Sequence, residues 1–365
     1  MTSITIQNVW KYYGKTVAVR DLNLVCDDNS FLCILGPSGC GKSSTLRMLA
    51  GLEQISAGEV RFGAKRVNDV PPKDRDIAMV FENYALYPHK TVMENIANPL
   101  KLRGLGEAAI GEKVRKAARL LEIDQLLDRK PAQLSGGQKQ RVAIGRAIVR
   151  EPALFLFDEP IAHLDAKLRA HMRGELKHLQ RQLRTTTIYV THDQLEALSM
   201  ADKIAVMHEG VLQQLGTPHE VYNRPSNEWV AGFVGDPPMN FFDCRLEGHA
   251  GTVFACNAAL RVPLTAQQAA TLDRPGASAE VRLGVRPDDI AVTCGVAQPG
   301  ATAGEIFVTE PIGGDTLVDI RLPGEQRILA RTRAAFAGEA GAPCSLALDE
   351  NRIHLFARDT GLAYF

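Results

Sequence analysis

The chain has 365 residues, 45% of them hydrophobic and 23% charged, and its 42 basic residues equal its 42 acidic ones. This composition is ordinary for a core-forming chain, and the length predicts two or three domains. With no basic excess, we do not expect binding to nucleic acid or to a lipid surface. We also expect no signal peptide and no membrane-spanning helix, because no apolar run approaches the ~20 residues that a span requires.

A β-type pattern opens the chain. Alternating apolar residues predict strands over 4–9 and 17–24, with a turn at 13–15. Tyr12 and Tyr13 precede this turn, and an exposed aromatic ring there is a candidate for stacking on a nucleic base. A half-buried strand residue would give the same pattern, so both interpretations stay open.

A glycine-rich segment follows an apolar run at 31–35. Gly36 to Ser43 reads GPSGCGKS, which matches GxxxxGK[ST], and a helical pattern begins near Lys42. In this context the backbone N–H groups surround a phosphate, Lys42 adds a positive charge and the Ser43 hydroxyl is suited to Mg²⁺. The expected phosphate contacts are Gly36, Pro37, Ser38, Gly39, Cys40, Gly41, Lys42, Ser43 and Ser44.

The seven cysteines are odd in number and are never spaced as CxxC. This pattern predicts reduced thiols in a cytosolic protein and no zinc site. Cys40 lies inside the phosphate loop, where a helix N-terminus lowers a thiol pKa. The alternative is that Cys40 is only a small residue that fits the loop.

The middle of the chain predicts a helical insertion in an α/β core. A strand over 77–81 leads into a polar and aromatic segment at 82–89, and residues 91–127 are mostly helical in pattern. LSGGQ at 134–138 then opens a helix through Val149. Two adjacent glycines at a helix start leave N–H groups for a second anion site.

Two buried strands are expected to carry polar groups at their carboxyl ends. Residues 153–157 are apolar and run into Asp158 and Glu159, which suit Mg²⁺ ligation and polarisation of an attacking water. One of these two acids could instead cap the following helix. A β-branched strand at 185–190 delivers His192 to the same edge of the sheet, where it would reach a terminal phosphate.

Together these motifs resemble the ATP-binding cassette (ABC) family over about the first 235 residues. The resemblance implies bound ATP and Mg²⁺, with Tyr13 stacking on adenine and Ser135, Gly136, Gly137 and Gln138 forming the signature motif. The implied metal ligands are Ser43, Glu82 and Asp158. The implied catalytic residues are Lys42, Glu159 and His192.

The amino-acid sequence in and around the motifs resembles most specifically the bacterial importers of maltose, trehalose and glycerol phosphate. RDIAMVFENYALYPH and YVTHDQLEALSMADKIAVM are similar to their ATPases, and LGVRPDDI is similar to their appended regulatory domain. Residues 241–356 read as short alternating strands with Gly and Pro turns. We therefore expect an α/β P-loop NTPase domain over 1–235, with a helical subdomain at about 88–150, and an all-β OB-like domain of TOBE/MOP type over 236–365.

The resemblance also implies a function and partners. It indicates an ATPase that energises import of a carbohydrate, polyol or glycerol-type solute. The alternatives are an importer of polyamine, iron or sulfate, and a non-transport cassette protein acting on ribosomes or DNA. The implied partners are a second ATPase subunit, identical or different, and two transmembrane permease subunits that dock near residues 84–89. An extracytoplasmic solute-binding protein is an indirect partner. No nucleic acid is expected to bind. The implied location is the cytoplasmic face of the plasma membrane, as a peripheral subunit.

Two positions depart from the pattern of the family. Glu82 stands where the family has Gln, and Ala162-His163-Leu164-Asp165 stands where the sugar importers usually have Ser-Asn-Leu-Asp. A second carboxylate near the terminal phosphate repels it or raises its own pKa. One hypothesis is a weakened site in a subunit that pairs with a different ATPase; the other is a neutral change within an active homodimer.

Overall fold

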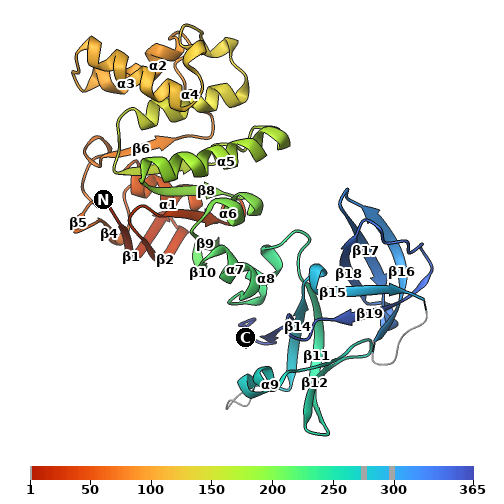
Figure 1. The fold of residues 1–365 in the computed structure, drawn as a ribbon. Helices are drawn as coiled ribbons and strands as arrows, with labels where there is room; N and C mark the ends of the chain where they lie inside the picture. The colour runs from red at the N-terminus through yellow and green to blue at the C-terminus, as the bar shows by residue number, and fades with distance from the viewer. Residues whose placement is uncertain (1, 273–277, 296–300) are drawn as a thin grey trace. The chain divides into compact units, whose positions relative to one another are not determined.

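The computed structural model describes residues 2–272, 278–295 and 301–365 (Figure 1). The chain divides into two compact units, Met1–His219 and Glu220–Phe365. The domain boundary that we expect after residue 235 refers to the domains of the family rather than to these compact units, and it stays a prediction.

The first unit contains a four-stranded antiparallel sheet in the order β2-β1-β4-β5. The first two strands have the predicted turn between them, and the side chains of Ile4, Ile6 and Val9 are buried. The strands are β1 (Ile4–Tyr13), β2 (Thr16–Cys26), β4 (Ala57–Phe62) and β5 (Lys65–Arg66).

A six-stranded sheet forms the centre of the first unit, in the order β10-β9-β3-β8-β7-β6. Strands β6, β7, β8, β3 and β9 run parallel, and β10 is an antiparallel edge strand. All residues of β3, β7 and β8 are buried, as a central parallel sheet requires. The strands are β3 (Phe31–Leu35), β6 (Ile77–Val80), β7 (Leu154–Asp158), β8 (Thr186–Thr191), β9 (Lys203–His208) and β10 (Val211–Gly216).

Helices α1 (Lys42–Ala50) and α6 (Gln194–Met200) pack against this sheet, and α5 (Ala166–Leu183) packs against α6. Helix α1 starts at Lys42, as the sequence predicts, and ends at Ala50, with Gly51 as its C-cap in the left-handed region. The buried Arg75 guanidinium donates to the carbonyls of Met48 and Leu49 at 2.7 and 2.8 Å. These bonds satisfy carbonyls at the C-terminal end of α1 and so fix the helix that follows the phosphate loop.

The predicted helical insertion is present as α2 (Val92–Leu102), α3 (Glu107–Leu120) and α4 (Gly136–Ile148), which lie together at one end of the first unit (Figure 1). Helix α2 starts with a capping box between Thr91 and Glu94. Helix α4 ends at Ile148, and Val149 is its C-cap rather than its last residue.

The second unit holds two five-stranded antiparallel sheets, in the orders β13-β12-β11-β14-β20 and β15-β19-β16-β17-β18. One hydrophobic core joins side chains of both sheets, so the predicted β-rich fold of this region is present. The strands are β11 (Asn240–His249), β12 (Thr252–Cys256), β13 (Arg261–Pro263), β14 (Glu280–Val285), β15 (Ile290–Cys294), β16 (Thr302–Pro311), β17 (Asp315–Arg321), β18 (Arg327–Arg333), β19 (Pro343–Leu348) and β20 (His354–Ala357). The structure adds the short helices α7 (Pro218–Asn223), α8 (Glu228–Phe233) and α9 (Ala266–Leu272).

The cysteines are free thiols, as predicted. Among the described residues, no helix is both long and apolar enough to span a membrane.

Candidate functional site

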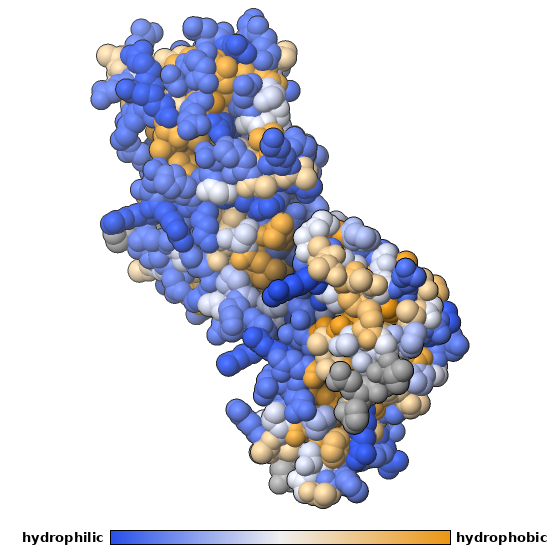
Figure 2. All heavy atoms as spheres, turned by 45° about the vertical axis from the view of Figure 1, so that its right-hand side comes forward, coloured by the Kyte–Doolittle hydropathy of each residue, from blue (hydrophilic) through white to orange (hydrophobic). Residues whose placement is uncertain are grey.

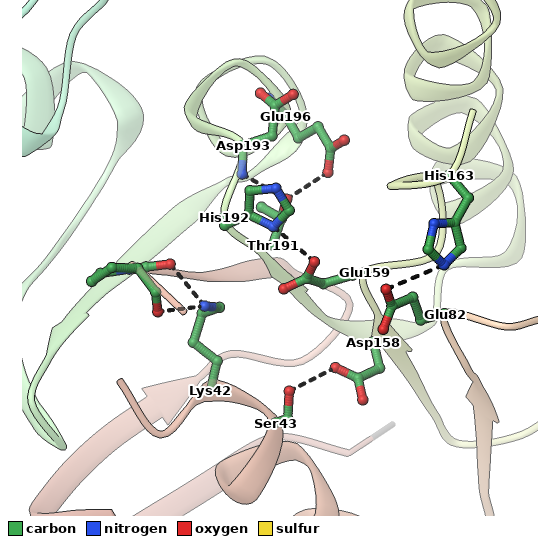
Figure 3. Close-up of polar contacts among 12 residues, drawn as sticks. Lys42, Ser43, Glu82, Asp158, Glu159, His163, Thr191, His192, Asp193 and Glu196 are labelled. Carbon is green, nitrogen blue, oxygen red and sulfur yellow. Dashed lines mark hydrogen bonds and ion pairs between the residues drawn. The ribbon is translucent and has the colours of Figure 1, made fainter. Parts of the chain in front are cut away.

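Four neighbouring strands of the central sheet end at one edge and deliver the predicted site residues to it (Figure 3). The phosphate loop follows β3, and His192 follows β8. Asp158 ends β7, and Glu82 comes shortly after β6. Because these strands are parallel, their carboxyl ends meet at the edge where α/β proteins bind ligands.

The backbone of the phosphate loop requires glycine at several positions. Gly39 and Gly41 have φ values of 81° and 100°, in the left-handed region. A Cβ atom on Gly36 would lie 2.2 Å from the carbonyl oxygen of Met207. The loop therefore curls closely over the end of the sheet.

Lys42 is almost completely buried, with 4% of its surface exposed. Its ammonium donates to the carbonyls of Gly36 and Pro37 at 2.7 and 2.9 Å, so the side chain folds back along the loop that precedes it. A cation held at the mouth of the loop is positioned for an incoming anion.

Cys40 is buried in the same loop, and this burial raises the pKa of its thiol. The effect of burial exceeds that of the nearby Lys42 charge and of the backbone N–H groups, which lower the pKa. The structure therefore favours a small residue that fits the loop over a reactive thiolate.

Ser43 and Asp158 meet across the site. The Ser43 hydroxyl donates to Oδ1 of Asp158 at 3.1 Å. Burial raises the pKa of Asp158, and the Ser43 hydrogen bond partly offsets that effect. A hydroxyl and a carboxylate oxygen side by side suit a hard cation such as Mg²⁺, which keeps several non-protein ligands. Among the described residues, no group of three or more His, Cys, Asp or Glu side chains could hold a metal ion.

Glu159 and His192 contact each other between the two loops that carry them. Oε2 of Glu159 lies 2.7 Å from Nδ1 of His192. The backbone N–H of Glu159 donates to Val190 at 3.0 Å, which ties the end of β7 to β8. Neither Asp158 nor Glu159 caps the next helix, because Asp165 is the N-cap of α5.

A buried network behind His192 was not anticipated from the sequence. The Tyr189 and Thr191 hydroxyls both donate to Oε2 of Glu196, at 2.8 and 2.7 Å, and Glu196 is only 2% exposed. The Thr191 hydroxyl also accepts from the N–H of Asp193 at 3.0 Å. The backbone on both sides of His192 is thus anchored to one carboxylate. The available signal was an acidic residue four positions after His192, flanked by the apolar residues Leu195 and Ala197.

Glu82 contacts His163 rather than the Ser43 and Asp158 pair. Nε2 of His163 lies 3.3 Å from Oε1 of Glu82 (Figure 3). Both residues depart from the family pattern, and the fold brings them together. Ser43 thus hydrogen-bonds Asp158, whereas Glu82 contacts His163 and lies near enough to Asp158 to contribute to raising its pKa.

Tyr13 lies at the end of β1 with 45% of its surface exposed. Its hydroxyl is 3.3 Å from the Ser44 hydroxyl and also bonds Glu53, and the Lys11 ammonium lies 4.7 Å from the ring centroid. The ring is therefore held beside α1 while remaining open to solvent, as a base-stacking residue requires.

The signature residues lie on α4. Ser135 and Gln138 form a capping box, in which the Gln138 N–H donates to the Ser135 hydroxyl at 3.4 Å and the Ser135 N–H donates to Gln138 at 3.0 Å. The N–H of Gln138 is therefore already occupied. A Cβ on Gly137 would lie 2.9 Å from Leu168, so this glycine also serves close packing against α5. In Figure 1, α4 lies apart from α1, and the single chain does not bring the signature to the phosphate loop.

Comparisons with known proteins agree with this geometry. Residues 19–162 match the sequence model of the family described as ABC transporter, residues 235–290 match the MalK OB fold domain, and residues 283–356 match the TOBE domain. The chain is 48% identical over 376 residues to the trehalose/maltose import ATP-binding protein MalK of Thermococcus litoralis, covering 100% of both chains. It is 47% identical over 362 residues to the sn-glycerol-3-phosphate import ATP-binding protein UgpC of Escherichia coli O6:H1, covering 99% of both.

A solved structure is also similar. The dimeric structure of MJ0796, a bacterial ABC transporter cassette, matches 59% of this chain and 98% of its own length, with a TM-score of 0.54 and 30% identity. A second structure of that cassette, dimeric and bound to ADP and Pi in a post-hydrolysis state, matches to the same extent. The full-length identity to import ATP-binding proteins and the three matched domains lead to one conclusion: this chain belongs to the ABC transporter family and is the ATPase subunit of an importer.

Proposed function

We propose that this chain binds ATP with Mg²⁺ at the edge formed by β3, β8, β7 and β6, between two copies of the cassette, and that hydrolysis there drives import of a carbohydrate, polyol or glycerol-type solute. The observation that carries the proposal is the convergence of Lys42, Ser43, Asp158, Glu159 and His192 on one sheet edge, with the 2.7 Å contact between Glu159 and His192. Phosphoryl transfer depends mainly on positioning and charge stabilisation, which such an edge supplies.

Each residue has a role that its position suits. Lys42 exchanges its two carbonyl partners for phosphate oxygens, while Ser43 and Asp158 hold Mg²⁺, whose positive charge would stabilise the charge that develops on the phosphate. Glu159 polarises the attacking water, and His192 fixes the Glu159 carboxylate and reaches the terminal phosphate. Tyr13 stacks on the adenine ring.

The proposal requires a second cassette. Ser135, Gly136 and Gly137 lie on α4, apart from the phosphate loop of their own chain (Figure 1). In a head-to-tail dimer they face the terminal phosphate bound by the partner, so that ATP joins the two chains and hydrolysis releases them. The dimeric state of the similar MJ0796 cassette supports this arrangement.

A groove of about 480 Å³ in the first unit is the proposed docking site for a permease subunit. Its walls come from β6, the segment after it, α2 and α4, and they include Tyr87, Pro99, Leu102 and Arg150. Leu102 is 81% exposed. Figure 2 shows hydrophobic side chains grouped among hydrophilic ones at this helical end of the unit. An exposed apolar groove suits a short helix of a partner protein.

The docking proposal is tested with Leu102→Glu. Co-purification of the chain with its permease subunits should fall at least tenfold, while ATP binding by the isolated chain stays unchanged. Leu120→Glu, at a partly exposed position of α3, is the matched control and should co-purify normally. Equal co-purification of both variants would place the permease elsewhere.

The solute is proposed from the names of the relatives, trehalose/maltose and sn-glycerol-3-phosphate import proteins. The test reconstitutes the chain with its permease and solute-binding partners and measures ATP turnover with each candidate solute. Stimulation by maltose, trehalose, a polyol or glycerol phosphate is expected. Stimulation only by a polyamine, iron or sulfate would replace the solute class but leave the importer ATPase in place.

A further inference from the structure

The Glu82–His163 pair links two loops of the candidate site. Glu82 lies just after β6, and His163 lies in the turn between β7 and α5. Nε2 of His163 is 3.3 Å from Oε1 of Glu82, and their side chains are 59% and 51% exposed (Figure 3). The two atoms lie within the distance of an ion pair.

Each of the two loops is fixed by other contacts. Arg146 of α4 donates to the carbonyls of Tyr84 and Ala85, at 3.0 and 2.6 Å, and so holds the segment that follows Glu82. On the other side, the N–H of Ala162 donates to the Glu159 carbonyl at 3.3 Å. The Glu82–His163 contact therefore joins a loop held by the helical part to the turn that starts at Glu159.

Other negative charges lie near the Glu82–His163 pair. Glu82 adds to the negative charge near Asp158 and Glu159, and it contributes to raising the pKa of Asp158. The contact with His163 on the neighbouring turn limits the orientations open to the Glu82 carboxylate.

We propose that His163 is a positioning residue for Glu82: its imidazole holds the Glu82 carboxylate in the orientation that the ATPase site uses, and the two residues act as a pair. This inference rests on the proposed nucleotide site. The departure at position 82 is then compensated, because the departure at position 163 supplies a partner for the Glu82 carboxylate. A weakened site in a heterodimer is then not needed to explain Glu82.

The test is a double-mutant cycle on the purified full-length chain, with His163→Ala, Glu82→Gln and the double variant. An exposed pair of this kind has a coupling that corresponds to about a two- to fivefold effect. We expect His163→Ala to lower kcat by that factor when residue 82 is Glu, and to have almost no effect when it is Gln. His163→Gln, which keeps an N–H donor of similar reach, should restore most of the rate.

A binding measurement provides a second readout that does not use turnover. ATP affinity is measured with and without Mg²⁺ for each variant. The Mg²⁺-dependent gain in affinity should fall about two- to fivefold in His163→Ala and recover in His163→Gln, while Mg²⁺-free affinity stays constant. The matched control is His178→Ala, at an exposed position of α5 that bonds Gln182, which should change neither quantity.

The possible outcomes distinguish a failure of the proposed function from a failure of the positioning role of His163. If the parent chain binds no ATP, the proposed function fails. If the parent binds and hydrolyses ATP but His163→Ala has the same effect with Glu82 and with Gln at position 82, the positioning role of His163 is wrong and the function stands.

Discussion

Nδ1 of His192 lies 2.7 Å from Oε2 of Glu159, although the two residues are 33 positions apart in the chain. The contact crosses from the end of β8 to the residue after β7, two adjacent parallel strands. It places a proposed general base beside a group that orients it, which is the arrangement expected of a water-activating pair.

The first prediction concerns Glu159→Gln. The amide keeps the shape of the side chain but cannot take a proton from water, so ATP turnover should fall about 10²–10⁴-fold. ATP binding should persist, and the ATP-bound dimer should accumulate in light-scattering measurements because release requires hydrolysis. Turnover within tenfold of the parent would remove Glu159 from the proposed role.

The second prediction concerns Lys42→Ala. A charge-assisted bond to phosphate contributes about 1.5–3 kcal/mol, so ATP affinity should fall about 10- to 100-fold by equilibrium dialysis. The exposed Lys73→Ala variant is the control for loss of one positive charge and should bind ATP as the parent does. Unchanged affinity in Lys42→Ala would mean that the loop does not bind the phosphates.

The third prediction uses the buried Glu196. Burial raises the pKa of this carboxyl above its ordinary value of 4.5, even though Tyr189 and Thr191 donate to it. The folded state then binds more protons than the unfolded state between 4.5 and the higher folded pKa, so stability falls as pH rises through that window. Glu196→Gln should remove this part of the pH dependence, measured by urea unfolding at several pH values. An identical slope in parent and variant would contradict the prediction.

Tyr189→Phe serves as the companion variant for that network. It removes one hydrogen bond to Glu196 and should cost about 1–3 kcal/mol of unfolding free energy, because a buried acceptor loses a partner. In contrast to Glu196→Gln, it leaves the titrating carboxyl in place, so the pH dependence should remain.

The fourth prediction concerns His354 in the second unit. Burial, with a contribution from the Arg286 charge, lowers the pKa of His354 to about 4 from 6.5. The unfolded state then binds more protons between these two values, so stability is lost as pH falls through this window, on the order of 3 kcal/mol by pH 4. His354→Gln should flatten that part of the acid profile, measured by thermal unfolding from pH 7 to pH 4. Equal acid sensitivity in the two proteins would exclude His354 as a source.

Local sequence patterns predicted the structure correctly where one stretch of chain forms one helix, strand or loop. The GPSGCGKS segment predicted strand, loop and helix, and α1 begins at Lys42 as expected. The apolar run before Asp158 predicted a buried strand, and all of β7 is buried. These features follow from period and turn chemistry, which are written in consecutive residues.

Contacts between residues that are distant in the chain could not be predicted from such local patterns. The Glu196 anchor behind His192 and the packing of Gly137 against Leu168 depend on which strands and helices become neighbours. The cap of α5 was also decided by geometry, since Asp165 took the role considered for Asp158 or Glu159.

Local motifs alone indicate the kind of chemistry, because the residue types that hold phosphate, metal and water stand in short motifs whose spacing is local. How those motifs are joined depends on the three-dimensional fold. The order of the parallel strands put Glu82 within 3.3 Å of His163, and a residue's partner across a sheet edge is set by strand order and packing rather than by spacing along the chain.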